Sequence, residues 1–232
     1  MDDDRQLMRV HIATLFVLDE RGRMTHVNEP EGKRAPRFFL GRTARGCECR
    51  ARDDIDDQLL RELESACSAE PATEAALLPP HGETRYEDIL ARQEPVQGVE
   101  AGPAFCFPPR LPSTARAILV TEANAEVLRP HLEAWLPDVP DRQPMFALVV
   151  DGEARALCCS VRITALAHEA GVETATQFRG RGYAAEVVVA WANAVRAMGR
   201  MPLYSTSWQN AASRTLARKL GLILFGADVL IT

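Results

Sequence analysis

Two glycines and two arginines stand close together in the stretch QFRGRGYAA, residues 177–185. The segment GVETAT before it has the composition of a β-strand, and apolar residues at helical spacing follow it. A glycine-rich turn that begins a helix exposes several main-chain N–H groups, which the positive end of the helix dipole reinforces. Glycine lets a ligand approach these groups closely because it has no side chain. The stretch therefore predicts a binding site for a pyrophosphate.

Two classes of nucleotide-binding protein use such a junction. Gly180, Gly182 and Ala185 satisfy a relaxed G-x-G-x-x-A pattern, the outline of a dinucleotide-binding fingerprint. That fingerprint also needs an acidic residue about 20 positions later to bind the ribose hydroxyls. Between Glu186 and Asp228 the chain has no Asp or Glu. The interval instead contains Arg196, Arg200, Arg214, Arg218 and Lys219. Coenzyme A, with its pyrophosphate and ribose phosphate, suits this environment better than a nicotinamide cofactor, so a hydride-transferring enzyme is only a third alternative.

The stretch ETATQFRGRGYA resembles the signature of the GNAT superfamily of N-acetyltransferases. In that signature a Gln or Arg is followed by two residues, a Gly, one residue, and a Gly or Ala, and Gln177, Gly180 and Gly182 match these places. The later stretch WQNAASRTLARKLGL is similar to a second family element, in which an Asn begins a helix that ends in Lys-x-Gly. The resemblance covers about residues 113–232 and does not extend to residues 1–110.

The resemblance implies that acetyl-CoA is the cosubstrate. Main-chain N–H groups of the loop would bind its pyrophosphate, those near Thr174 would polarise the thioester carbonyl, and Asn210 would face the pantetheine arm. The expected cofactor-binding residues are Thr174, Gln177, Phe178, Arg179, Gly180, Arg181, Gly182, Tyr183, Ala184 and Asn210. Lys219 and Gly221 match the end of the family's following helix.

Transfer to an amine requires that the amine lose a proton, and Glu173 is the candidate base for this step. It lies on the strand beside the expected thioester, and it is the only carboxylate within a dozen residues after Glu169. The alternative is an ordinary solvent-facing strand residue. His168, which we expect in a loop, is a weaker candidate.

The departing thiolate needs a proton or a stabilising charge. Many relatives place a tyrosine seven residues after the Asn that begins the helix, but here that position is Ala217. Tyr204 or Ser213 would then serve as the donor, or the thiolate leaves unassisted. Tyr204 and Tyr183 are equally compatible with packing against a core.

The proline-rich segment CFPPRLPST, residues 106–114, predicts a domain boundary near residue 110. Upstream, residues 11–30 read as a hairpin, and DDIDDQLLRELESAC reads as a helix that Asp53 or Asp54 caps. A turn at PPHG and a helix at TRYEDILARQ follow. This part, residues 1–110, is predicted to be a small α/β domain of unknown role.

Downstream, residues 113–232 are predicted to form the catalytic domain. A strand and helix precede a hairpin centred on Asp151 and Gly152. The strand GVETAT, a helix from about 182 to 199, the strand PLYSTSW and the helix QNAASRTLARKLG come next, before two short strands at LILFG and DVLIT. The predicted fold class is α/β (α+β): a GNAT-like mixed central sheet with flanking helices, preceded by the small N-terminal domain.

The amino-acid composition limits which binding partners and which cellular location we expect. The net charge of −5 over 232 residues argues against nucleic-acid binding. The acidic start and the lack of a long apolar run make the cytoplasm the expected location and exclude a membrane partner. The six cysteines form no C-x-x-C pair, so we expect no metal, and Cys158 and Cys159 are expected to be buried in a strand.

We therefore expect an acetyl-CoA-dependent N-acetyltransferase that acts on a primary amine of a small molecule or peptide. The alternative is a non-catalytic or regulatory acyl-CoA-binding module, which the missing tyrosine at Ala217 motivates. The identity of the amine and the oligomeric state, including a homodimer, stay open.

Overall fold

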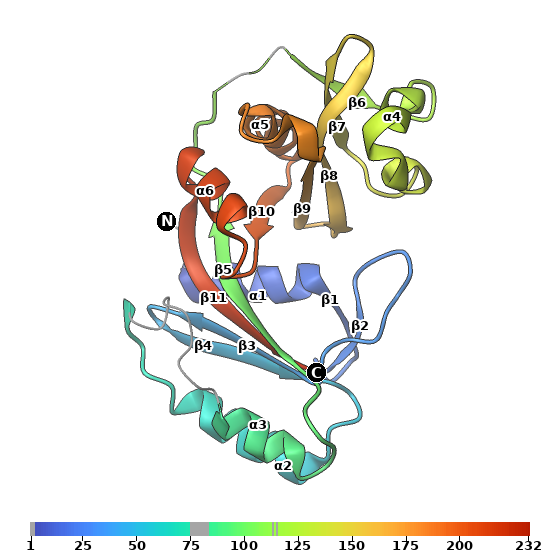
Figure 1. The fold of residues 1–232 in the computed structure, drawn as a ribbon. Coiled ribbons are helices and arrows are strands. Elements are labelled where there is room, and N and C mark those ends of the chain that lie inside the picture. Colours follow the sequence, from blue (N-terminus) through green and yellow to red (C-terminus); the bar gives the residue numbers. More distant parts are fainter. Residues whose placement is uncertain (1–2, 75–83, 113, 115) are drawn as a thin grey trace. The chain divides into compact units, whose positions relative to one another are not determined.

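The computed structural model describes residues 3–74, 84–112, 114 and 116–232, which divide into two units (Figure 1). The first unit contains the described residues up to Cys106 together with Ser205–Arg214 and Ile223–Thr232. The second contains those of Phe107–Tyr204 and Thr215–Leu222. The break after Cys106 falls in the proline-rich segment, but the last strand belongs to the first unit because it pairs there. The linear division into 1–110 and 113–232 stays a prediction.

The sheet of the first unit has the strand order β4-β3-β11-β5, and all its neighbouring strands are antiparallel. A separate hairpin pairs β1 with β2. The strands are β1 (Phe16–Leu18), β2 (Met24–Val27), β3 (Phe38–Thr43), β4 (Gly46–Ala51), β5 (Val99–Cys106) and β11 (Ile223–Ile231). The helices are α1 (Asp4–Leu15), α2 (Asp57–Ser68) and α3 (Thr84–Ala91). Side chains of β3, α2, α3 and β11 form one buried apolar core.

The N-terminal hairpin prediction was wrong for residues 11–15, which end helix α1. The side chain of Asp3 caps this helix by accepting a hydrogen bond from the N–H of Arg5. Leu7, Met8, Ile12 and Leu15 are buried, and this spacing brings them to one face of a helix. The predicted strand began too early because a short apolar run does not distinguish a strand from the end of a helix.

Two further predicted boundaries in the first unit were wrong. Helix α2 is capped by Asp56, which accepts from the N–H of Gln58 at 2.7 Å, rather than by Asp53 or Asp54. The segments LILFG and DVLIT form the single strand β11, whose pairing with β5 has an irregularity between Leu224 and Gly226. The predicted turn at PPHG lies mostly outside the described residues.

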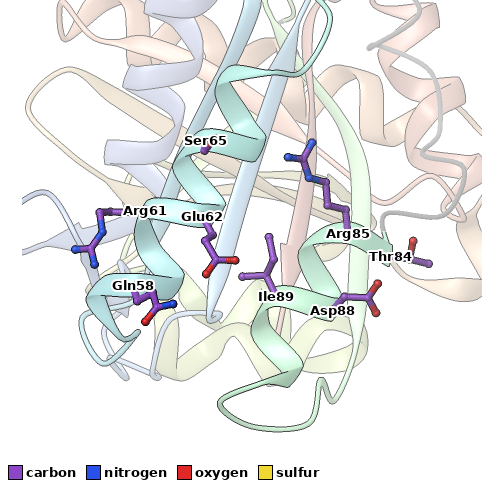
Figure 2. Close-up of a pocket in the computed structure, with 8 residues that line it drawn as sticks. All are labelled: Gln58, Arg61, Glu62, Ser65, Thr84, Arg85, Asp88 and Ile89. Carbon is purple, nitrogen blue, oxygen red and sulfur yellow. The ribbon is translucent and has the colours of Figure 1, made fainter.

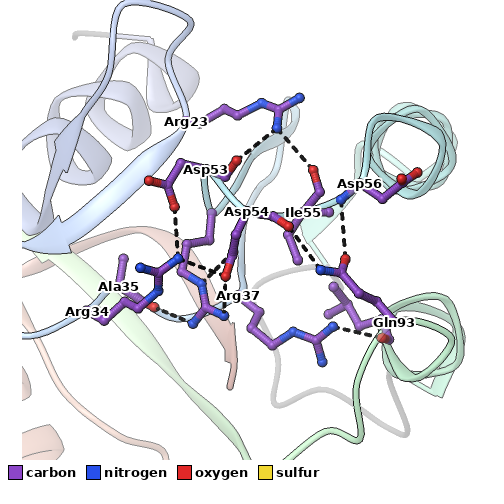
Figure 3. A network of polar contacts seen from close by, with 11 residues as sticks. Arg23, Arg34, Ala35, Arg37, Asp53, Asp54, Ile55, Asp56 and Gln93 are labelled. Atoms are coloured by element: carbon purple, nitrogen blue, oxygen red, sulfur yellow. Dashed lines mark hydrogen bonds and ion pairs between the residues drawn. The ribbon is translucent and has the colours of Figure 1, made fainter.

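The acidic run before α2 is held by ion pairs and hydrogen bonds (Figure 3). Arg34 and Arg52 both bind the carboxylate of Asp54, at 2.8 and 2.7 Å. The hydrogen bond from Arg52 keeps the pKa of this carboxyl below its ordinary value. Gln93 donates to the carbonyl of Asp54 and accepts from the N–H of Asp56. These contacts with the protein itself account for the acidic residues of this run, so a bound ligand is not needed to explain them.

The sheet of the second unit has the strand order β10-β9-β8-β7-β6. Its pairs are antiparallel except β10 with β9, so the sheet is mixed. The strands are β6 (Ala117–Val120), β7 (Met145–Val150), β8 (Glu153–Ile163), β9 (Ala167–Thr174) and β10 (Met201–Ser205). The helices are the 3-10 helix η2 (Ala125–Leu128), α4 (Arg129–Leu132), the 3-10 helices η3 (Glu133–Asp138) and η4 (Thr176–Phe178), and α5 (Tyr183–Ala197). Helix α6 (Ala211–Lys219) contributes residues to both units.

Helices cover both faces of this sheet, with α5 on one side of β7 and β8 and α4 on the other (Figure 1). Successive side chains of β8 point to opposite faces of the sheet, so this strand contributes residues to the packing on both faces. Leu157 and Cys159 join the apolar cluster that includes Leu128 and Leu132, whereas Ser160 accepts a hydrogen bond from the indole of Trp191 on α5. Directly opposite residues of an antiparallel pair lie on the same face of the sheet, so the face to which each β9 side chain points follows from its partner on β8.

The predicted hairpin at Asp151 and Gly152 is confirmed. Both residues have positive φ, 54° and 81°, as the tight turn between β7 and β8 requires. Cys158 and Cys159 are fully buried in β8 as predicted, and burial raises the pKa of the Cys159 thiol to about 12. No group of His, Cys, Asp or Glu in the described part of the chain is arranged to hold a metal ion.

Candidate functional site

The glycine-rich loop connects β9 to α5, as the sequence predicts. Gly180 and Gly182 have φ values of 78° and 83°, the left-handed conformation that glycine adopts without strain. Gly182 is the residue that caps α5. Among the described residues, the main-chain N–H groups of Gly180, Arg181 and Gly182 donate to no acceptor. The first turn of a helix adds further unpaired N–H groups, so the loop is a site for an anion.

A lysine ammonium lies beside this loop. A Cβ atom placed on Gly182 would stand 3.4 Å from Nζ of Lys219, the last residue of α6. Within the described residues, Lys219 forms no ion pair with a carboxylate, so its charge is available to a ligand. Because Lys219 is about 37 positions further along the chain, the loop pattern alone does not show that it approaches.

A surface pocket of about 460 Å³ adjoins the first turn of α5 in the second unit. Its lining is largely apolar, and within it Arg116 and Glu186 form an ion pair at 2.7 Å. The pocket is lined by Pro112, Thr114, Arg116, Ala185, Glu186, Val189, Lys219 and Leu220. Its position next to the anion site of the loop makes it a place for an apolar or aromatic part of the same ligand.

The side chains of Gln177 and Phe178 contact the protein itself. The amide of Gln177 donates to Nδ1 of His131 at 3.0 Å, and the ring of Phe178 packs edge-on against the same imidazole. The guanidinium carbons of Arg155 and Arg181 lie 4.2 and 5.4 Å from the centre of the Phe178 ring. These contacts tie the loop to α4 and β8, and no signal in the sequence identifies His131 or Arg155 as its partners.

Among the described residues, strand β9 pairs with a neighbour on only one side along its second half. Its parallel pairing with β10 comprises Ala167, His168 and Glu169 and ends there. Pairing with β8 continues as far as Thr174. Alternate N–H groups from Ala170 to Thr174 therefore point away from β8. Thr174, the predicted thioester-binding residue, lies at the end of this open edge, beside the loop.

Glu173 lies on the same open segment of β9 and is partly exposed. It is paired with Leu157, so its side chain is on the face that η2, α4 and η3 cover. One carboxylate oxygen, Oε2, accepts a hydrogen bond from the indole Nε1 of Trp135 at 2.5 Å. Glu169, at the start of the same strand, is by contrast only 2% exposed. Trp135, on η3, was not among the predicted site residues.

The prediction that His168 lies in a loop was wrong, because His168 is a buried residue of β9. Its Nδ1 lies 2.8 Å from the hydroxyl of Ser160, and Arg200 donates to its Nε2 at 2.7 Å. Burial, together with the charge of Arg200, lowers the pKa of His168 to about 4. The imidazole is therefore neutral at pH 7 and part of a packed network.

The remaining predicted residues are divided between the units. Tyr204 is buried in β10 of the second unit, whereas Asn210 and Ser213 belong to the first. The side chain of Asn210 accepts from the N–H of Ser213 at 3.0 Å and thereby caps α6, as predicted. Ala217 is fully buried in α6 and offers no proton.

The first unit has its own surface groove, of about 750 Å³, between α2 and α3 (Figure 2). Arg61, Glu62, Arg85 and Asp88 line it. The two guanidinium groups and two carboxylates balance, so the groove favours no ligand of a single charge. Pyrophosphate-binding features are found instead in the second unit.

Comparison with known proteins supports the fold of this region. Residues 147–229 match the family model described as FR47-like protein. No protein of curated function matches the sequence. A GNAT-family protein from Novosphingobium aromaticivorans superposes with a TM-score of 0.50 and 19% identity, over 59% of this chain and 65% of that chain, just under two thirds of its length. A GNAT-family acetyltransferase from Colwellia psychrerythraea has a TM-score of 0.51 and 14% identity, over 79% and 75% of the two chains.

These likenesses confirm the expected fold class, a mixed sheet flanked by helices. The matched residues contain β8, β9, the glycine-rich loop and α5. The predicted pyrophosphate site, at the loop that begins α5, therefore lies within the matched part of the chain. No helix in the described ranges is long and apolar enough to cross a membrane. Residues 147–229 thus match the model described as FR47-like protein, and the fold that contains them is similar to the folds of GNAT-family proteins.

Proposed function

We propose that this protein is an acetyl-CoA-dependent N-acetyltransferase that acts on a primary amine. The observation that carries the proposal is the loop that begins α5, where three successive N–H groups have no acceptor within the described residues. A pyrophosphate would accept from these groups, and the helix dipole and the Lys219 ammonium would stabilise its charge. The residues present therefore fit the cosubstrate.

The rest of the cosubstrate has matching surfaces. The pocket beside Lys219 would receive the nucleotide end, since an apolar lining suits a purine and the Lys219 ammonium suits a phosphate. The pantetheine arm would follow the open edge of β9 toward the loop. Free N–H groups near Thr174 would then donate to the thioester carbonyl as charge develops on its oxygen.

In this proposal Glu173 accepts the proton of the attacking amine. The nitrogen forms a bond to the thioester carbon, the carbon–sulfur bond breaks, and the electron pair leaves with the sulfur. The thiolate then takes a proton. Ala217 cannot supply this proton, so Tyr204 or solvent must. The amine is presented by a small molecule or a peptide.

A non-catalytic acyl-CoA-binding module is the second candidate, and the observation in its favour is the methyl side chain at position 217. Such a module would share the loop and the pocket but would release no thiol. A dinucleotide-binding enzyme is less well supported because no acidic residue follows the loop at the required distance.

Calorimetric titration of the full chain tests the cofactor assignment. We expect acetyl-CoA and CoA to bind saturably with one site per chain, and NAD and NADH to give no heat of binding. The absence of acetyl-CoA binding by the folded protein would exclude both candidates. Tight binding of a nicotinamide nucleotide in its place would favour the dinucleotide-binding alternative.

A further inference from the structure

We propose that Trp135 is a positioning residue that orients the carboxylate of Glu173, an inference that rests on the proposed function. Trp135 lies on η3 and Glu173 on β9, 38 positions apart in the chain, and their side chains meet through the indole N–H and Oε2. Within the described residues this is the one hydrogen bond that the Glu173 side chain makes, and it forms no ion pair. The indole therefore fixes a carboxylate that would otherwise rotate freely.

The indole is itself held in place. The guanidinium carbon of Arg142 lies 5.8 Å from the centre of its ring, and Arg142 is bound to Asp138 at 3.0 Å. On the strand side, the ring tip is close to Gly171: a Cβ atom there would stand 3.6 Å from Cη2 of Trp135. The Arg142 cation and the side-chain-free Gly171 thus both border the ring and restrict its orientation.

The chemistry of the indole suits this role. The group only donates a hydrogen bond, so it occupies Oε2 and leaves the lone pairs of Oε1 to accept a proton. A hydrogen bond to a carboxylate is stronger than one between neutral groups, so the carboxylate of Glu173 stays in this orientation for a large share of the time. Trp135 would increase the rate without contacting the pyrophosphate.

The test is a double-mutant cycle with the substitutions Trp135→Phe and Glu173→Gln, measured with an accepted amine. Phenylalanine keeps an aromatic ring for Arg142 but removes the N–H, together with the Cη2 atom that lies near Gly171. We expect Trp135→Phe to lower kcat about tenfold or more, the scale of a hydrogen bond to a charged group. The KM for acetyl-CoA should change less than about twofold, because loop amides bind the cosubstrate. In the Glu173→Gln background, the same substitution should change kcat less than about twofold.

Independent effects would overturn the inference. An equal loss of kcat in both backgrounds would mean that Trp135 acts through packing or through the acceptor, and unchanged kcat in Trp135→Phe would mean that the hydrogen bond has no catalytic consequence. Circular dichroism of each variant verifies that it is folded, and Trp135→Tyr repeats the cycle if the phenylalanine variant is not. Failure of the proposed function is distinguishable, since the wild-type chain would then release no thiol with any amine.

Discussion

We expect the variant Gly182→Trp to bind acetyl-CoA at least about a hundredfold more weakly than the wild-type chain does. Gly182 begins α5, and its N–H group is one of those that have no acceptor in the described structure. An indole at this position would occupy the place of the pyrophosphate. It would also press on the Lys219 ammonium, because a Cβ atom on Gly182 already stands 3.4 Å from Nζ. Calorimetric titration with acetyl-CoA measures the loss.

A matched control separates this effect from backbone strain. Gly152 has a φ of 81°, nearly that of Gly182 at 83°, and a Cβ atom placed on it meets nothing within 4 Å. Because Gly152 lies in the turn between β7 and β8, Gly152→Trp imposes the same strain away from the loop. This control should lose a similar amount of thermal stability and keep its affinity. Wild-type affinity in folded Gly182→Trp would show that the loop does not bind the cosubstrate.

The variant Glu173→Gln is expected to turn over about a hundredfold to ten-thousandfold more slowly than the wild-type chain, the usual contribution of a general base. Glutamine keeps the size of the side chain and can still accept the Trp135 hydrogen bond, but it cannot take up the proton. The affinity for acetyl-CoA should hardly change, because Glu173 is on β9 and not in the loop. Steady-state kinetics with an accepted amine provides the measurement.

The pH dependence of this loss adds a second criterion. The deficit should shrink as the pH rises toward the pKa of the amine, since an amine that is already neutral needs no base. Glu122→Gln, which removes an exposed carboxylate of the same unit, should turn over at the wild-type rate. Near-wild-type turnover of Glu173→Gln at neutral pH would make Glu173 an ordinary strand residue.

Local patterns in the sequence were sufficient to predict most of the second unit. The Asp151 and Gly152 turn and the helix after Gly182 each depend on residues within a few positions of one another. The glycine-rich loop belongs to the same class, because its N–H groups and its glycines are adjacent in the chain. Short-range chemistry of this kind is visible without a structure.

Long-range partners could not be predicted from these patterns. The contacts of Glu173 with Trp135, of Gln177 with His131 and of Gly182 with Lys219 join residues 38, 46 and 37 positions apart. The burial of His168 depends on the packing of α5 against the sheet, which brings Trp191 to Ser160. In the first unit, β11 joins the sheet through pairing with β3 and β5, which lie far earlier in the sequence.

Release of free thiol from acetyl-CoA by the wild-type chain, with a panel of primary amines, tests the central claim most directly. The panel would contain amino acids, polyamines, aminoglycosides and peptides with a free N-terminus, and mass spectrometry would identify the acetylated product. The account predicts amine-dependent thiol release with one acetylated amine formed for each CoA. A folded protein that binds acetyl-CoA but releases no thiol with any of these amines would contradict it.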